Sequence, residues 1–287
     1  MNFERHCRVP RSTSFSLKRR DPADTGRLRK SDAEHWLQHG VDRLSEQQSR
    51  LYAQSTWAVL IVLQGMDASG KDSTIKHVMS GVNPQGCSVH SFKAPTRQEL
   101  AHDFLWRTVL ALPARGCIGI HNRSHYEEVV VTRVHPEILD RQSLPPQPRG
   151  EPLWRQRFRD INRFERYLTD NGTIVLKFFL HLSKSEQRQR FLDRLDEPEK
   201  FWKFQPDDVR ERRHWRSYMS AYEHALRETN TPWAPWYVVP ADHKWFTRLA
   251  VAEIIVKNLE RLKLRYPAVP DSLKKEWRTV RKALEKE

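Results

Sequence analysis

Residues 59–76 of this chain read VLIVLQGMDASGKDSTIK. The first six are nearly all apolar and lead directly into a glycine, which is typical of a strand buried on both faces. Gly65 and Gly70 are five positions apart and Lys71 follows, which gives the G-x-x-x-x-G-K pattern of a P-loop. In such a loop the backbone N–H groups surround a phosphate, the next helix points its positive end at the anion, and the lysine neutralises the outer phosphates. The stretch therefore predicts phosphate binding by Gly70 and Lys71.

One position of this motif is unusual. Asp72 stands where a Ser or Thr normally follows the lysine, and Ser73 comes next. We expect either that Ser73 substitutes for the missing hydroxyl or that a metal is held differently, and we count Asp72 and Ser73 among the predicted phosphate-binding residues. The alternative is a chance glycine turn. The apolar strand before the loop and the helical stretch after it argue against that alternative.

The composition is that of a basic globular protein. A length of 287 residues with 38% hydrophobic residues suffices for one large α/β domain, or for one domain with extensions. The net charge of +14 should attract polyanions such as nucleic acid, anionic membranes or phosphate chains. No apolar run reaches the ~18 residues of a membrane span, and no signal peptide is evident. Three cysteines without metal spacing indicate free thiols in a reducing compartment, so we expect a cytoplasmic protein.

Apolar stretches alternate with amphipathic ones along the chain. Turn residues separate them, and Thr96 and Ser183 are placed to cap helices. This alternation predicts an α/β fold with a parallel five-stranded sheet, helices on both faces and a helical lid. The predicted strands are 59–64, 88–92, 117–121, 173–182 and 236–239, and the predicted helices are 33–54 (capped by Ser31 or Asp32), 71–79, 96–112, 153–171, 184–230 and 245–265.

Both ends of the chain read differently from the middle. Residues 1–32 are basic, rich in Ser and Pro and poor in large apolar groups, so we expect an extended arm laid over the domain or a partner, or else a partly disordered tail. Residues 269–287 read as a basic tail containing a short helix. The P-loop domain is thus expected to span residues 33–268.

A second set of polar residues is expected beside the P-loop. In an open parallel sheet, ligands bind beyond the carboxyl ends of the strands, which places Lys93 and Asn122–Arg123 near the loop. P-loop enzymes usually hold a metal with an Asp where Asn122 stands, and an amide is a poor sole ligand for Mg²⁺. We therefore assign the metal to Asp67, whose alternative role is to cap backbone N–H groups. Arg123 suits a phosphoryl group, because its planar fork binds two phosphate oxygens.

The residues after Arg123 include two acids and a histidine. Glu127 and Glu128 would repel phosphate, so one of them should face a nucleoside or a metal. The alternative is a solvated helix face, about as plausible for Glu127 and favoured for Glu128. His125 has no partner that the sequence identifies, and we expect it to be structural.

The segment 184–216 is dense in Arg and Lys. Charges on helices usually form a solvated surface. However, positive charges greatly outnumber negative ones here, and the segment lies where P-loop kinases carry a lid that closes over the substrate. We favour a cationic lid. Its expected contacts with a long anion are Arg190, Arg194, Lys200 and Lys203.

At this point the motifs resemble a known family. GMDASGKDSTIKHVMSGVNPQG, SFKAPT, HDFLWR, NRSHYEE and LDEPEKFWKF are similar to blocks of the polyphosphate kinase 2 family, over about residues 21–268. The resemblance implies a phosphotransferase that moves a phosphoryl group between inorganic polyphosphate and a nucleotide, with Mg²⁺ or Mn²⁺. It also implies a P-loop core related to thymidylate kinases, a helical lid, and assembly as a homodimer or homotetramer.

The resemblance implies roles for single residues. Lys71 would bind the transferred phosphate, Asp67 would hold Mg²⁺, Arg123 would stabilise the transfer, and Lys93, Arg107 and the lid would line the phosphate or nucleotide channel. Arg107, Asn122 and Glu127 are the predicted nucleotide-binding residues. One class of the family reads D-R-S-W-Y-N where this chain reads Asn122 to Glu127, and Glu127 marks the class that accepts both AMP and ADP. Asn in place of Asp at 122 leaves the second metal ligand open.

Two other functions remain as alternatives. An ATP-dependent nucleotide kinase of the thymidylate kinase kind would share the P-loop, but the basic lid argues against it. A non-catalytic nucleic-acid-binding protein would share the charge, but no DNA- or RNA-reading motif is present.

Overall fold

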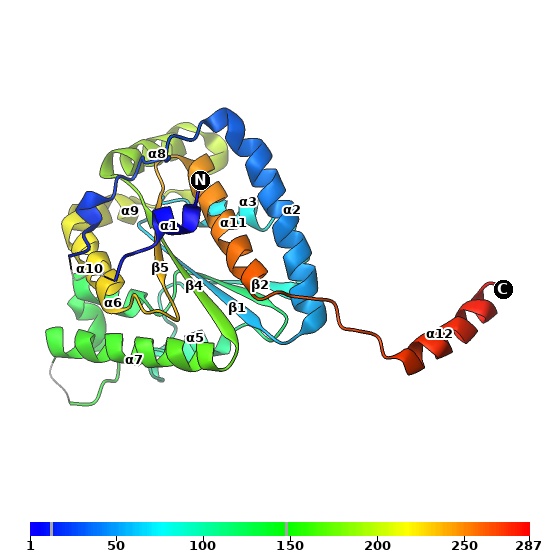
Figure 1. Ribbon diagram of the computed structural model, residues 1–287. Helices are drawn as coiled ribbons and strands as arrows, with labels where there is room; N and C mark the ends of the chain where they lie inside the picture. The colour runs from blue at the N-terminus through cyan, green and yellow to red at the C-terminus, as the bar shows by residue number, and fades with distance from the viewer. Residues whose placement is uncertain (12–13, 147–148) are drawn as a thin grey trace.

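The computed structural model describes residues 1–11, 14–146 and 149–287, and it has the predicted α/β architecture (Figure 1). The five strands lie in the order β2-β3-β1-β4-β5, and every neighbouring pair is parallel. All seven residues of β1 are buried, as expected for the central strand of a sheet covered on both faces. The strands are β1 Ala58–Gln64, β2 Cys87–Ser91, β3 Ile118–Asn122, β4 Thr173–His181 and β5 Trp236–Pro240.

Alternate residues of β1 face two separate cores. Val59, Ile61 and Leu63 pack with the helices α2 (Lys30–Gln54), α3 (Lys71–Val78) and α11 (Lys244–Arg261). Leu60 and Val62 pack on the other face with α6 (Glu127–Val134), α7 (Glu151–Asp170) and α10 (Trp215–Glu228). The sheet therefore lies between two helical layers, and the P-loop leaves it at the end of its central strand.

The stretch 184–230 was expected to be helical and 96–112 to be one helix, and both are divided into shorter helices. The stretch 184–230 consists of α8 (Lys184–Asp196), the 3-10 helix η4 (Pro198–Lys203), α9 (Pro206–Glu211), η5 (Arg212–His214) and α10. Pro198 and Pro206 explain the breaks, because proline is favoured in the first turn of a helix and cannot continue one. The stretch 96–112 consists of α4 (Arg97–Leu100), which has a full capping box at Thr96, and α5 (Trp106–Leu110).

The N-terminal arm lies against β5, α10 and α11. It contains α1 (Phe3–Cys7) and η1 (Leu17–Arg19), and Arg8 forms an antiparallel bridge with Tyr237. Its apolar residues, which the sequence reading passed over, are buried: Phe3, Cys7, Val9, Phe15 and Leu17. The helix expected to start after Ser31 or Asp32 begins at Lys30, with Arg29 as its N-cap residue.

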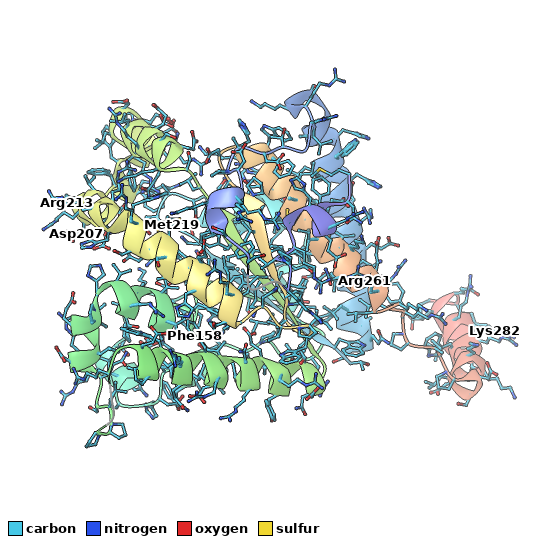
Figure 2. The ribbon with its side chains drawn as sticks, turned by 60° about the vertical axis from the view of Figure 1, so that its left-hand side comes forward. Phe158, Asp207, Arg213, Met219, Arg261 and Lys282 are labelled. Carbon is cyan, nitrogen blue, oxygen red and sulfur yellow. The ribbon has the colours of Figure 1, made fainter. Side chains whose placement is uncertain are left out.

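The remaining short elements are η2 (Pro84–Gly86), η3 (Pro136–Arg141) and the C-terminal helix α12 (Asp271–Leu284). No residue of α12 is buried, and Figure 2 shows Lys282 of this helix well away from the sheet. Within the described ranges, every helix is too short or too polar to pass through a lipid bilayer.

Candidate active site

The loop between β1 and α3 has the backbone of a tight phosphate-binding turn. Gly65 and Gly70 have φ angles of +151° and +99°, a region that favours glycine. A side chain at Gly65 would come within 2.8 Å of Ser69 Oγ and 2.9 Å of Leu180 O. The glycines of the motif are therefore required by the path of the loop.

Lys71 lies inside this loop. Its side chain is buried, and Nζ donates to Gly65 O at 2.8 Å and to Met66 O at 3.2 Å. Burial and the charge of Arg123 lower the pKa of Lys71, while Asp67, Glu127 and Asp72 act in the opposite direction. The ammonium group is thus held by carbonyl oxygens at the carboxyl end of the central strand.

Asp67 and Arg123 meet at the mouth of the loop. Arg123 Nη2 donates to Asp67 Oδ1 at 2.7 Å. Burial alone would lower the pKa of Arg123, but Glu127 and Asp67 raise it above its ordinary value. Arg123 also has a φ of +64°, an uncommon conformation for a residue with a side chain. The structure therefore brings together Asp67, Lys71 and Arg123, the three residues predicted to be catalytic.

A cavity of about 320 Å³ opens beside this cluster. Its lining includes the predicted site residues Asp67, Lys93, Arg107, Arg123 and Glu127. Burial raises the pKa of Glu127, although Arg123 and Lys71 oppose the shift. Tyr218 and Tyr222 of α10 also line the cavity. The sequence analysis missed both because they lie about 100 residues beyond the motif that follows the third strand, Asn122 to Glu127 (the strand-three motif).

Asp72, Asn122 and Ser73 are engaged with protein groups. Asn122 Nδ2 donates to Asp72 Oδ1 at 2.5 Å, so the amide holds the acid beside the loop. Ser73 Oγ accepts from Arg248 Nη2 at 2.8 Å. Within the part of the chain that the structure describes, Asn122 Oδ1 is buried without a hydrogen-bond partner. The structure thus links Asp72 to Asn122, two residues that were predicted to bind different substrates.

The residues at the loop fit a magnesium ion that is held largely by substrate. Among the described residues, no three His, Cys, Asp or Glu side chains are arranged to hold a metal by themselves. Mg²⁺ usually needs only one or two carboxylates, with water and phosphate oxygens as the other ligands. Asp67 can supply the carboxylate, and Asn122, at the end of the neighbouring strand β3, has an amide oxygen with no hydrogen-bond partner among the described residues.

The four predicted lid contacts lie in different surroundings. Arg190 is buried, and it donates to Ala68 O at 2.9 Å and to Ala241 O at 2.5 Å, so it supports the P-loop from α8. Arg194 pairs with Asp208 at 3.2 Å, and Lys200 pairs with Glu197. Lys203 lies 5.0 Å from the ring of Trp202. Figure 2 places Asp207 and Arg213 on the outer side of the same segment.

Two cations of α11 extend this positive region, and the sequence reading missed them. Burial and the charges of Arg190 and Lys200 lower the pKa of Lys244. Burial and Arg190 also lower the pKa of Arg248, whose guanidinium binds Ser73 Oγ. Their spacing of four residues near the start of the last core helix was the available signal, but that helix was interpreted only as packing.

Arg107 and Glu128 form a wall between two cavities. Arg107 is buried, donates to Lys93 O at 2.9 Å and lies 4.0 Å from Glu128. Glu128 accepts from Arg157 at 3.0 Å and from Gln142 at 2.7 Å. The favoured interpretation of Glu128 as a solvated residue was therefore wrong, because its carboxylate is buried among these groups.

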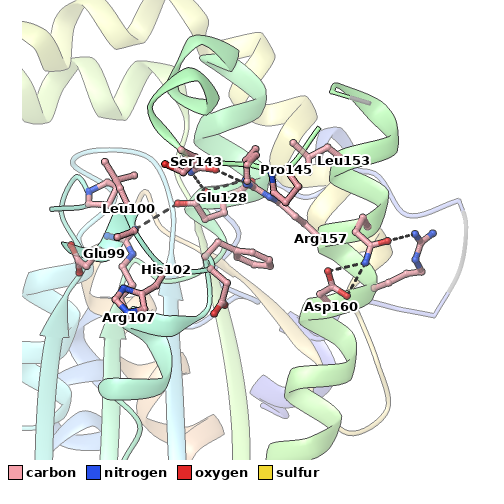
Figure 3. A pocket seen from close by; sticks show the side chains of 18 of the residues that line it. Glu99, Leu100, His102, Arg107, Glu128, Ser143, Pro145, Leu153, Arg157 and Asp160 are labelled. Atoms are coloured by element: carbon pink, nitrogen blue, oxygen red, sulfur yellow. Dashed lines mark hydrogen bonds and ion pairs between the residues drawn. The ribbon is translucent and has the colours of Figure 1, made fainter. Parts of the chain in front are cut away.

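Behind this wall lies the larger cavity, of about 700 Å³ (Figure 3). Figure 3 shows Arg107 and Glu128 on one side of it and Asp160 of α7 on another. The two cavities share the lining residues Pro95, Leu100, Arg107 and Glu128, so they are neighbours.

Comparisons with known proteins agree on one family. The sequence model of the polyphosphate kinase 2 family matches residues 27–267. An ADP-polyphosphate phosphotransferase of Rhodopseudomonas palustris is 52% identical over 86% of this chain and 86% of its own length. An AMP/ADP-polyphosphate phosphotransferase of Meiothermus ruber is 49% identical over 91% of this chain and 94% of its own. The crystal structure of polyphosphate kinase 2 from Arthrobacter aurescens superposes with a TM-score of 0.91 at 36% identity, covering 98% of this chain and 97% of that one.

Proposed function

This chain belongs to the polyphosphate kinase 2 family, with its P-loop kinase fold, and we propose how its residues perform the family's reaction. The reaction is the transfer of a phosphoryl group between polyphosphate and a nucleotide. The observation that carries the proposal is the 2.7 Å contact between Asp67 and Arg123 at the mouth of the loop that holds Lys71. It puts an acid and two cations around one point.

In this proposal Lys71 binds the phosphate being transferred and Arg123 stabilises its charge as the bonds change. Phosphoryl transfer is in-line, and catalysis consists mainly of positioning and charge neutralisation. Asp67 would hold Mg²⁺ (or Mn²⁺), with Asn122 at the end of the neighbouring strand β3. The ion would supply positive charge against the negative charge that develops on the phosphate oxygens.

The acceptor nucleotide is proposed to occupy the 320 Å³ cavity beside the loop. Glu127 lines it, and the name of the Meiothermus relative includes both AMP and ADP. Arg107 supports the cavity by holding the backbone of Lys93. We propose that this chain, too, phosphorylates AMP and ADP, with Glu127 facing the nucleoside.

Polyphosphate is proposed to lie along the cationic surface between the P-loop, the lid and α11. Lys200, Lys244 and Arg248 are the contacts that the cluster favours, because Lys244 lies near Arg190 and Lys200, and Arg248 lies near Arg190. We assign residues 184–216 to the lid, 33–268 to the phosphotransferase domain, 1–32 to the arm and 269–287 to the tail. We further propose a homodimer or homotetramer in the cytoplasm. The free state of Cys7, Cys87 and Cys117 is consistent with a reducing compartment.

An acceptor panel tests this function. The purified chain is given AMP, ADP, GMP or GDP with polyphosphate and Mg²⁺, and the products are separated by chromatography. We expect ADP and ATP from the adenine nucleotides, and no transfer by K71A, because its loop lacks the cation that the phosphate needs. Wild-type protein that uses ATP as donor and ignores polyphosphate would support the thymidylate kinase alternative instead. Full activity of K71A would contradict the role of the loop.

A further inference from the structure

Four titratable side chains lie buried beneath the turn that follows β3 and carries Arg123 and Glu127. Lys177 Nζ is 2.6 Å from Glu165 Oε2, and both side chains are 0% exposed. Tyr126 OH donates to Glu165 Oε1 at 2.7 Å and accepts from Lys177 at 2.9 Å. His125 is fully buried, with Nε2 3.7 Å from Glu165, and burial lowers its pKa. We call Tyr126, Glu165 and Lys177 the buried triad.

The buried triad joins four separate elements. Lys177 comes from β4, Glu165 from α7, and Tyr126 is the N-cap residue of α6. Lys177 also donates to Thr229 O at 2.8 Å, directly after α10. Its side chain is on the same face of β4 as Val175 and Phe179, which belong to an apolar core. A charged side chain is therefore placed where the sheet could have carried an apolar one.

Stability alone does not account for such an arrangement. Removing two charges from water is costly, and replacing a buried ion pair by apolar residues of similar size is often neutral or stabilising. By contrast, hydrogen bonds between fully buried groups fix geometry, because few other partners are within reach. The question is which geometry this triad fixes.

The turn above it carries Arg123 and Glu127. Arg123 has a φ of +64°, and such a conformation persists only where the surroundings determine it. Arg123 N donates to Leu63 O at 3.0 Å, and Gln64 Nε2 donates to Ser124 Oγ at 3.0 Å, so the start of the turn is tied to the central strand. The end of the turn is tied by Tyr126, whose N–H reaches Ser124 Oγ at 3.2 Å and whose hydroxyl reaches the ion pair.

We propose that Tyr126, Glu165 and Lys177 are positioning residues for phosphoryl transfer, which hold the strained turn so that Arg123 and Glu127 face the P-loop. This inference rests on the proposed role of Arg123. The triad touches neither substrate nor metal, and it acts by keeping the Arg123 guanidinium beside Asp67. A displacement of about 1 Å at a reacting centre is enough to reduce the rate roughly 100-fold.

The first test removes one oxygen atom. In Y126F the ring remains and only the hydroxyl link to the ion pair is lost. We expect kcat to fall roughly tenfold, with the KM values for ADP and polyphosphate within about twofold of wild type, because a displaced Arg123 stabilises the transition state less while substrate binding is kept. Y237F is the matched control. In the wild type the Tyr237 hydroxyl donates to the Glu4 carboxylate at 3.4 Å in the opposite core, so the kcat of Y237F should equal that of the wild type.

A second variant, K177M/E165L, removes both charges together and should melt close to wild type while losing kcat as Y126F does. The decisive measurement is a double-mutant cycle with R123K. If the triad acts through Arg123, Y126F should cost less than about twofold in the R123K background. An equal tenfold loss in both backgrounds, or wild-type kcat in both Y126F and K177M/E165L, overturns the inference. Because each comparison is a ratio to an active parent, an inactive wild type would instead refute the proposed function.

Discussion

At the scale of single residues, the two acids of the P-loop region are each paired with a particular side chain. Asp67 binds Arg123 and Asp72 binds Asn122, although the two acids are only five positions apart in the chain. The two carboxylates therefore have different electrostatic surroundings. One is paired with a cation beside the 320 Å³ cavity, and the other accepts from a neutral amide.

This difference yields a prediction for the metal. D67N should lower kcat roughly 100-fold and move the Mg²⁺ activation midpoint to higher concentration, because the carboxylate that would hold the metal is replaced by a weaker, neutral ligand. D72N is the matched control, since its carboxylate is engaged by Asn122, and it should have a much smaller effect. Activity measured against MgCl₂ concentration checks both. Wild-type metal dependence of D67N would contradict the assignment.

The sequence predicted which residues surround the loop better than it predicted their contacts. The P-loop pattern located Lys71, and the strand-three motif located Arg123, because each motif is local in the chain. The hydrogen bond between Asp72 and Asn122 spans 50 positions of the chain, and the one between Ser73 and Arg248 spans 175. Such contacts depend on how the elements pack, and a single sequence does not specify that.

At the scale of elements, α11 has two functions on one helix. Its apolar side packs on the sheet, and its first turns carry Lys244 and Arg248 beside the P-loop. Because only the apolar pattern was considered, the helix was predicted correctly and its charge was overlooked. Likewise, the lid was expected to consist of cationic helices, but its charge density does not indicate where Pro198 and Pro206 divide them.

The position of these cations predicts a donor-specific effect. K244A and R248A should each raise the KM for polyphosphate roughly fivefold, equivalent to about 1 kcal/mol of lost ionic interaction, and leave the KM for ADP unchanged. K257A, on the same helix but paired with Glu4, is the matched control. Initial rates over a range of polyphosphate concentrations measure the effect. Equal changes in both KM values would place the two cations outside the donor path.

At the scale of the whole molecule, several histidines are enclosed between the layers. Burial lowers the pKa of His121 to about 4, against a backbone hydrogen bond to Ala111 that raises it. Burial lowers the pKa of His125 and His181 in the same direction. The folded protein thus keeps these rings neutral at pH values where the unfolded chain binds protons.

This burial predicts a loss of stability in mild acid. A histidine whose pKa is depressed on folding contributes stability that is present above its unfolded pKa of 6.5 and is lost as the pH falls toward about 4. For His121 the loss should be about 2 kcal/mol between pH 6.5 and about pH 5. Thermal unfolding across this range should show a falling midpoint in wild type and a shallower fall in H121Q. An equal fall in both would exclude His121 as a source.

The arm shows what composition conceals about the whole fold. Its Arg, Lys, Ser and Pro content indicated an extended segment, but five of its apolar side chains are buried. Phe3 and Cys7 join the core that contains α11, and Val9, Phe15 and Leu17 join the core that contains α10. These apolar residues are separated by polar ones in the sequence, so no periodic pattern predicts that they are buried. Arg261 of α11, labelled in Figure 2, then fixes the arm by donating to Glu4 at 2.5 Å.

The seating of the arm also makes the two borders of the sheet unequal. Arg8 and Val9 occupy the outer side of β5, where Val9 N donates to Trp236 O at 2.9 Å. At the other border, β2 pairs within the described chain only with β3, and its last three residues are exposed. Unlimited edge-to-edge pairing, in which the sheet of each molecule extends that of the next, requires two unpaired edge strands on every copy. With one border closed, such growth stops at a pair.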